Sequence, residues 1–146
     1  MVESSSIALK IDQLMRRIHA DLHPRAVEFD HHRVGPIGGM LLLAIGEREP
    51  IDIGALVQQM GRDKSQISRL VQTLERKGLI TKEQSIDDGR VSLLRLTEAG
   101  GHQLRSIQAV LMDVVFKVME PLSDREQAAF SQLLDKILTS RNRDAD

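Results

Sequence analysis

The side chains best suited to chemistry recur on one side of the segment 63–78. Its apolar residues at 67, 70, 71 and 74 have the i, i+3, i+4, i+7 spacing of an amphipathic helix, so they mark an inward face. The outward face then carries polar hydrogen-bonding groups, namely Ser65, Gln66, Ser68, Arg69, Gln72, Thr73 and Arg76. Arginine, glutamine and serine are the residue types that read the edges of base pairs and bind phosphates.

Positive charge is concentrated in the same stretch. Between Arg62 and Lys82 there are six basic and two acidic residues, a net charge of +4, although the whole chain carries −1. A basic segment in an otherwise acidic chain is the electrostatic pattern expected of a nucleic-acid binder. For this segment taken alone, an ordinary amphipathic helix with a solvated charged face is the alternative.

A second candidate lies in the sequence Asp88-Gly89-Arg90. Extended runs flank it at 79–83 and 91–96, and the Asp-Gly pair between them predicts a β-hairpin with a charged tip. The Asp88 carboxylate could orient the Arg90 guanidinium across a tight turn, and a narrow minor groove of DNA would attract that guanidinium. The alternative is a plain turn that uses Asp-Gly for backbone reasons only.

Two short helices are expected to position the polar face. The first is predicted over 52–61 with Asp52 as its N-cap, and the second over 63–78 with Asp63 as N-cap and Gln66 in capping-box position. Two short helices joined by a few residues around a glycine form a helix-turn-helix. With the hairpin that follows, the order of elements is that of a winged helix-turn-helix.

Longer helices flank this arrangement. A central core helix is predicted over 36–47, opened by a proline, and a first helix over 5–29, with a serine at 4–6 as cap and a kink or end at Pro24. Thr97 opens a long helix to about residue 120, and a complete capping box at 123–126 opens the last helix.

The outer helices carry apolar stripes that exceed what a wing domain of about fifty residues could cover. A second copy of the chain is therefore expected to cover them, unless they only complete the core of one subunit. The predicted fold class is mainly α with a small β-hairpin wing. Within one domain over 1–146, a winged helix-turn-helix at 35–100 is flanked by dimerisation helices at 5–29 and 101–141.

Four short motifs carry a resemblance to a known family. They are SQISRLV at 65–71, LERKGLI at 74–80, DGR at 88–90 and LRLTEAG at 94–100. In this order and spacing the chain resembles the MarR (multiple antibiotic resistance regulator) family of bacterial winged-helix transcription regulators. The likeness in layout covers nearly the whole chain, and the likeness in sequence is strong from about 51 to 101.

The resemblance implies a homodimer with interlocking terminal helices, bound to double-stranded DNA. The helix matching Lys64–Lys77 would enter the major groove, which adds Lys64 to the DNA-binding residues, and Arg90 would enter the minor groove. Most family members repress transcription, and many release DNA when a small aromatic or anionic ligand binds. We therefore expect a ligand-responsive repressor on a pseudo-palindromic operator.

Histidines raise two further possibilities. His19 and His23 have the i, i+4 spacing that can chelate a metal on a helix, which would make a metal-responsive regulator, but no third ligand is identifiable and no metal site is predicted. In the family the ligand pocket lies between the dimer helices and the DNA-binding lobe. Residues that could line it here are Arg16, His19, His23 and His32.

Other function classes find no support. The absence of cysteine excludes disulfides, thiolate metal sites and thiol redox switches. No Gly-x-Ser-x-Gly elbow and no phosphate loop is present, so neither an enzyme nor a cofactor is expected. A winged-helix adaptor that binds protein instead of DNA is the alternative, and the intact polar face at 65–76 argues against it.

The chain is expected to act in the cytoplasm. Its longest apolar run, residues 40–45, is far shorter than the roughly 18 residues that span a membrane. The first residues show neither a basic start nor an apolar stretch of the kind found in secretory signals.

Overall fold

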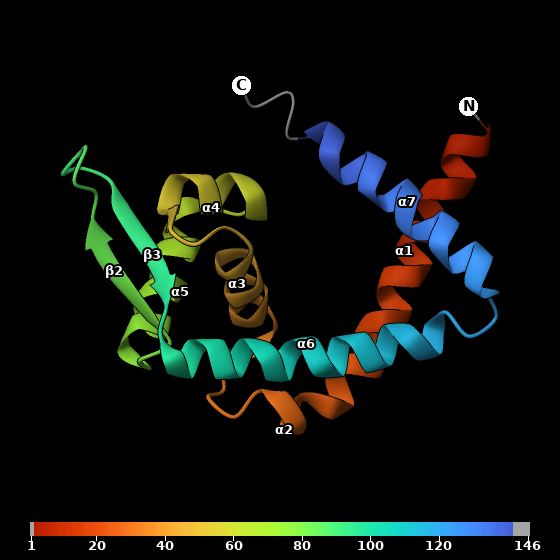
Figure 1. Ribbon diagram of the computed structural model, residues 1–146, viewed down its shortest axis with the longest axis horizontal. Coiled ribbons are helices and arrows are strands. Elements are labelled where there is room, and N and C mark those ends of the chain that lie inside the picture. Colours follow the sequence, from red (N-terminus) through yellow and green to blue (C-terminus); the bar gives the residue numbers. More distant parts are fainter. Residues whose placement is uncertain (1, 142–146) are drawn as a thin grey trace. The chain divides into compact units, whose positions relative to one another are not determined.

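The computed structural model describes residues 2–141 (Figure 1). Helices dominate, and a small antiparallel sheet forms the wing, which confirms the predicted fold class. The elements in chain order are α1 (Val2–Leu22), η1 (His23–Arg25), α2 (Ala26–Phe29), α3 (Gly35–Arg48), β1 (Ile51–Asp52), α4 (Ile53–Met60), α5 (Lys64–Arg76), β2 (Ile80–Gln84), β3 (Ser92–Leu96), α6 (Glu98–Val118) and α7 (Asp124–Arg141).

Two compact units make up this part of the chain. Residues 20–111 form one unit, which holds α3, α4, α5, the sheet and the first part of α6. Residues 2–19 and 112–141 form the other, which holds most of α1, the end of α6 and α7. The first unit extends beyond 35–100 because α2 and part of α6 belong to it, and Ile107 of α6 joins its core.

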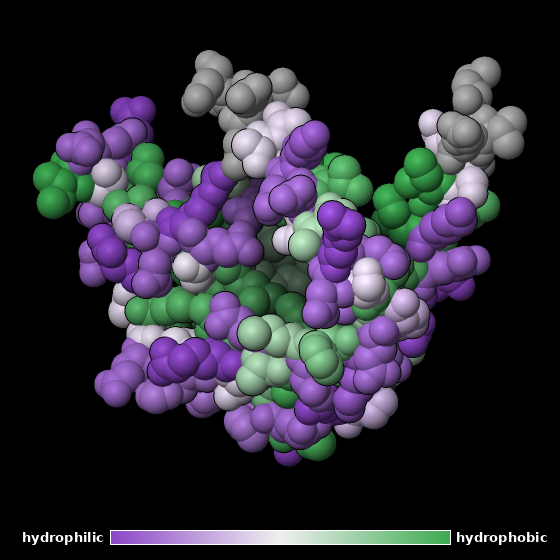
Figure 2. Space-filling model, turned by 45° about the vertical axis from the view of Figure 1, so that its right-hand side comes forward, coloured by the Kyte–Doolittle hydropathy of each residue, from purple (hydrophilic) through white to green (hydrophobic). Residues whose placement is uncertain are grey.

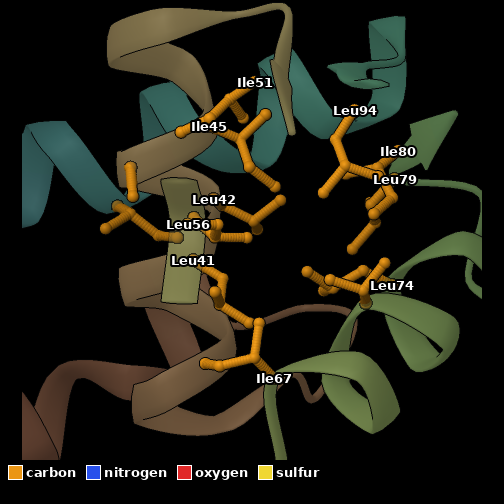
Figure 3. Close-up of a cluster of buried hydrophobic side chains, with 13 residues drawn as sticks. Leu41, Leu42, Ile45, Ile51, Leu56, Ile67, Leu74, Leu79, Ile80 and Leu94 are labelled. Atoms are coloured by element: carbon orange, nitrogen blue, oxygen red, sulfur yellow. The ribbon is translucent and has the colours of Figure 1, made fainter. Parts of the chain in front are cut away.

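The core of the 20–111 unit lies between the helices and the sheet. Figure 3 shows Leu41, Leu42 and Ile45 of α3 on one side, and Leu74 of α5 with Leu79 on the other. All five are at most 1% exposed. Full burial of one such side chain stabilises a fold by roughly 1.5–3 kcal/mol, so α3 is the central core helix that its composition predicts.

Three of the predicted start and stop residues of the two short helices, α4 and α5, are confirmed. The Asp52 carboxylate caps α4 by accepting a hydrogen bond from the Ala55 N–H at 2.8 Å. Gly61 and Gly78, which follow α4 and α5, have φ angles of +61° and +73°. Residues other than glycine rarely adopt this left-handed backbone conformation, so each glycine ends its helix as predicted.

The capping box predicted for α5 is wrong. Asp63 occupies the N-cap position, but its side chain makes no cap hydrogen bond. Its carboxylate instead accepts a hydrogen bond from the Ser65 hydroxyl. A serine hydroxyl two residues along the chain competes with the backbone N–H groups for the same acceptor, and here the hydroxyl is the group that binds.

The wing contains one strand more than predicted. The strands have the order β1-β3-β2, with Ile51 of β1 opposite Leu94 of β3 and Ile80 of β2 opposite Leu96. The predicted hairpin of β2 and β3 is confirmed, and its strands begin one residue later than expected. The added strand, β1, has only two residues, too few to show the alternation by which strands are recognised in a sequence.

The helix that opens the chain starts earlier than predicted and ends as predicted. α1 begins at Val2, so the serines at 4–6 lie inside the helix and not at its N-cap position. It ends at Leu22, and Pro24 lies in the 3-10 turn that follows, because a proline in a helix interior removes a hydrogen bond and clashes with the preceding turn.

The two C-terminal helices begin with the predicted caps. The Thr97 hydroxyl accepts from the Gly100 N–H at 3.0 Å, and the Ser123 hydroxyl accepts from the Glu126 N–H at 3.2 Å. The capping box at Ser123 is nevertheless incomplete, since the Glu126 carboxylate accepts from the Ser123 hydroxyl and not from its backbone N–H. α6 ends at Val118, two residues before the predicted end.

No helix among the described residues is long and apolar enough to cross a membrane.

Candidate nucleic-acid interface

Helix α5 has one buried face and one polar face. Ile67, Val71 and Leu74 are each at most 1% exposed, and Leu70 packs against the same core, so the predicted inward face is confirmed. The eight residues of this helix that were predicted to bind DNA all reach the surface. Five are exposed and three are partly exposed, in the order Lys64, Ser65, Arg69, Gln72, Arg76 and Gln66, Ser68, Thr73.

Hydrogen bonds along α5 hold several of these polar side chains. Arg69 Nε donates to the Ser65 carbonyl at 3.3 Å, and Thr73 Oγ1 donates to the Arg69 carbonyl at 3.0 Å. Arg76 Nη2 lies 3.4 Å from Thr73 Oγ1. The arginines therefore lie along the helix surface, and the two terminal nitrogens of Arg69 have no partner among residues 2–141 and stay available as donors.

The first turn of α5 carries a positive charge and a serine hydroxyl that is already hydrogen-bonded. Lys64 is exposed, and Ser65 donates its hydroxyl proton to Asp63. The Ser65 oxygen can still accept a hydrogen bond, whereas donation to a base or a phosphate requires the contact with Asp63 to break. From Lys64 to Thr73 the helix carries no acidic residue, which suits a surface that faces phosphates.

The wing loop between β2 and β3 is a hydrogen-bonded turn. The Ser85 N–H donates to the Val91 carbonyl at 2.8 Å, and the Val91 N–H donates to the Asp88 carbonyl at 3.0 Å. The Asp88 carboxylate accepts from the backbone N–H of Arg90 at 3.0 Å, and not from its guanidinium. The loop spans seven residues, and Gly89 has no positive φ angle, so it is not the tight Asp-Gly hairpin turn that the sequence suggests.

Arg90 itself is exposed at the tip of the wing. Its guanidinium has no hydrogen-bond or ion-pair partner among the described residues, whereas its backbone is fixed through Asp88. This arrangement presents an exposed cationic side chain on a hydrogen-bonded main chain. A weakly hydrated guanidinium of this kind fits the negative potential of a narrow minor groove.

The four candidate ligand residues lie in different parts of the chain. Arg16 and His19 belong to the unit of residues 2–19 and 112–141, and His23 and His32 belong to the 20–111 unit. Arg16 pairs with Asp12 at 2.7 Å, and the three histidines are exposed. Among the described residues, no group of three histidine, aspartate or glutamate side chains is placed to hold a metal ion.

A cavity of about 450 Å³ within the 20–111 unit was not foreseen from the sequence. Its lining includes Gly46 of α3 and Leu104 and Arg105 of α6, but none of the four candidate ligand residues. Small residues at 46 and 101 on two helices were the only signal for it, and glycine alone does not predict a cavity.

The terminal helices expose large apolar side chains. Ile7, Ile11 and Met15 of α1 are 50–57% exposed, and Ile137 and Leu138 of α7 are 64% and 67% exposed. Figure 2 shows apolar patches open at the surface between hydrophilic side chains. The stripe on α6 is different, since Ile107, Val114 and Val118 are at most 8% exposed within the chain. The side chains of α1 and α7 named above are uncovered, as in a surface that packs against a partner.

The helix-turn-helix and wing also match proteins already known. A model of the MarR family matches residues 39–91, from α3 to the Arg90 loop. The uncharacterized HTH-type transcriptional regulator YxaD of Bacillus subtilis is 30% identical over 98 residues, which cover 67% of this chain and 68% of that protein. The chain belongs to the MarR family of transcriptional regulators. This confirms the resemblance, and members of the MarR family are regulators and not enzymes.

Two solved structures extend the likeness over most of the MarR-family fold. A probable transcriptional regulator from Pseudomonas aeruginosa has 27% identity and a TM-score of 0.69, covering 90% of this chain and 96% of that one. The PcaV transcriptional regulator from Streptomyces coelicolor, solved in complex with its natural ligand, has 26% identity and a TM-score of 0.62. That match covers 88% of this chain and 91% of PcaV.

Proposed function

We propose that this MarR-family protein is a homodimeric, ligand-responsive repressor that binds a pseudo-palindromic site in double-stranded DNA in the cytoplasm. The observation that carries the proposal is that α5 has a buried apolar face and a solvent-exposed polar face. Ile67, Val71 and Leu74 fix the helix in the core at no more than 1% exposure, and the eight polar residues on its other side reach solvent.

The chemistry of that surface suits the major groove. α5 has 13 residues and is therefore about 20 Å long, and the groove is about 12 Å wide and admits a helix. Arg69 and Gln72 are the residue types that bind guanine and adenine edges, and Lys64 and Arg76 are suited to phosphates. Arg90 on the wing would reach the adjacent minor groove.

A dimer follows from the exposed apolar faces of α1 and α7. A second copy is the natural occupant, because a symmetric pair buries the same faces on both chains. Two copies of α5 related by a two-fold axis would read half-sites about one helical turn, ~10 bp, apart. The domain assignment follows from this reading, with DNA binding at 35–100 and dimerisation at 5–29 and 101–141.

A small-molecule effector is proposed from the family and from residue chemistry. PcaV was solved with its natural ligand. In the present chain Arg16, His19, His23 and His32 are the proposed effector-binding residues, and their basic groups favour an anionic ligand. Ligand binding would shift the protein toward a state with lower affinity for DNA, and DNA would lower ligand affinity by the same factor.

A gel-shift experiment tests the proposal. The full-length protein is titrated onto the DNA segment directly upstream of its own gene, with an excess of unrelated competitor DNA. A discrete shifted band that survives the competitor is expected. Binding that the competitor abolishes, or no binding at all, would favour a winged-helix adaptor that contacts protein instead.

A further inference from the structure

The C-terminal end of α5 is tied to a distant turn of the chain. Lys77 follows α5 directly, and its Nζ donates hydrogen bonds to two successive main-chain carbonyls, that of His32 and, at 3.3 Å, that of Arg33. These residues lie 44 and 45 positions earlier, between α2 and α3. All of these groups belong to the 20–111 unit.

The turn that receives Lys77 has an unusual backbone. Arg33 has a φ angle of +53°, and it is the one residue other than glycine with a positive φ in the described chain. The Asp30 carboxylate holds the turn by accepting from the Val34 N–H at 2.8 Å and from the Gly35 N–H at 3.1 Å. Arginine seldom adopts this conformation, so the surrounding bonds must maintain it.

One ammonium group reaches both carbonyls of this turn. The His32 and Arg33 carbonyls both accept from Lys77 Nζ, so the turn presents them together as a site for a single cation with several donors. The lysine ammonium has this character.

A second anchor holds the same end of α5. Thr97 Oγ1 donates to the Gly78 carbonyl at 2.6 Å, and the Thr97 N–H donates to the Leu79 carbonyl at 3.0 Å. The segment after α5 is thus bonded to Thr97 through its main chain and to the 30–35 turn through Lys77. Without Lys77, only the Thr97 side of this clamp would remain.

We propose that Lys77 is a positioning residue for DNA recognition, which sets the C-terminal end of α5 through the 30–35 turn and does not bind a phosphate. The inference rests on the proposed function, because it assumes that α5 reads DNA. It departs from the sequence-based reading, in which Lys77 is one of six basic residues in the DNA-binding segment. Lys64, at the other end of α5, has no hydrogen-bond partner among residues 2–141 and is the matched candidate for a phosphate contact.

The test compares Lys77→Met with Lys64→Met, since each removes one positive charge from one end of α5. Kd for the operator is measured by fluorescence anisotropy over a range of salt concentrations. We expect Lys77→Met to raise Kd by up to about tenfold, because binding must then order the end of α5 that the Lys77 bonds otherwise fix. The slope of log K against log salt should stay unchanged. Lys64→Met should lower that slope by about one. A slope that falls by about one for Lys77→Met, or an unchanged Kd, would overturn the proposal.

A second measurement separates positioning from a general loss of stability. Asp30→Ala removes the carboxylate that holds the same turn. If both substitutions act through this turn, the variant that combines Lys77→Met with Asp30→Ala should have a Kd no higher than that of the single variant with the higher Kd. Additive losses would contradict this. In addition, Lys77→Met should speed hydrogen exchange at the Val34 and Gly35 amides in the absence of DNA, and unchanged exchange would show that Lys77 does not hold the turn.

The hydrogen-exchange measurement does not depend on DNA. If the wild-type protein binds no DNA, the proposed function and the role of Lys77 in recognition both fail. The tie between Lys77 and the turn would then still be judged by its exchange result. If the wild type binds and only the Lys77 comparison fails, the proposed function stands and this inference alone is wrong.

Discussion

The Asp88 carboxylate accepts a hydrogen bond from the backbone N–H of Arg90, 3.0 Å away, at the tip of the wing. An aspartate that bonds the main chain two residues later forms a local turn of its own. The bond holds the backbone that carries Arg90 and does not involve its guanidinium. Asp88 therefore acts on Arg90 through the loop and not through an ion pair.

Substitutions at Asp88 should separate the hydrogen bond from the charge. Asp88→Asn keeps an acceptor oxygen and removes a negative charge near the DNA, so it should bind DNA at least as tightly as the wild type. Asp88→Ala loses the acceptor and should bind more weakly than Asp88→Asn, by about 0.5–1.5 kcal/mol. Anisotropy titrations of both variants measure the difference, and equal losses for the two would point to a direct ion pair with Arg90.

Removal of the Arg90 side chain should affect DNA binding and spare the fold. The side chain is exposed and has no partner among the described residues, so Arg90→Ala should leave the melting temperature followed by circular dichroism nearly unchanged while DNA affinity falls clearly. Arg90→Lys should recover only part of the affinity, because a strongly hydrated ammonium fits a narrow minor groove less well than a guanidinium. An unfolded Arg90→Ala protein would instead make Arg90 a structural part of the turn.

Arg69 offers a test of sequence reading by α5. If it reads a guanine, Arg69→Ala should lower specific affinity by about 1–3 kcal/mol and relax the preference at one base pair. The measurement compares operator duplexes with single base-pair changes and an unrelated duplex as control. An equal loss on every duplex, with a salt slope lower by about one, would assign Arg69 to a phosphate. No loss on any of them would remove it from the interface.

The exposed face of α7 should control the oligomeric state. Ile137 is 64% exposed, and Ile137→Asp would place a charge in the proposed dimer interface. Sedimentation at micromolar concentration should give about twice the chain mass of 16.4 kDa for the wild type and about one chain mass for this variant. Gln132→Asp introduces the same negative charge at an exposed polar position of the same helix. It is the control and should stay dimeric. A monomeric wild type would exclude the dimer.

The buried amide of Gln103 predicts a stabilising substitution. Gln103 on α6 is 3% exposed, and its Nε2 has no hydrogen-bond partner among the described residues. A buried donor without a partner costs about 1–3 kcal/mol, and methionine has a similar shape without that donor. Gln103→Met should therefore raise the free energy of unfolding by about 1 kcal/mol in urea titrations followed by circular dichroism. A loss of stability would show that the amide has a partner in solution, such as a buried water.

The sequence predicts the recognition helix well because its signals are local. The spacing of Ile67, Val71 and Leu74 defines the buried face, and this alone places the polar residues on the other side. Gly61 and Gly78 end their helices with positive φ angles. This conformation is a local preference of glycine and does not depend on distant residues. The turn signal between two extended runs likewise predicts the hairpin of β2 and β3, and the family motifs agree with that order of elements.

Contacts between distant residues, and choices between nearby partners, escaped prediction. Lys77 bonds to carbonyls 44 and 45 residues away, which no spacing rule can indicate. Asp63 and Asp88 each had more than one acceptable donor close by, and the sequence does not decide between a hydroxyl, a backbone N–H and a guanidinium. Strand β1 depends on pairing with β3, about 40 residues later, and carries no periodicity of its own.

Selection of binding sites from random double-stranded DNA tests the central claim most directly. The full-length protein is run in parallel with the Arg69→Ala and Arg90→Ala variants through several rounds of capture and sequencing. We expect the wild type to enrich a pseudo-palindrome with half-sites ~10 bp apart, with Arg69→Ala losing preference in the half-sites and Arg90→Ala enriching it weakly. A wild-type pool that stays random, or one that matches the pools of both variants, would contradict sequence-specific binding by α5 and the wing.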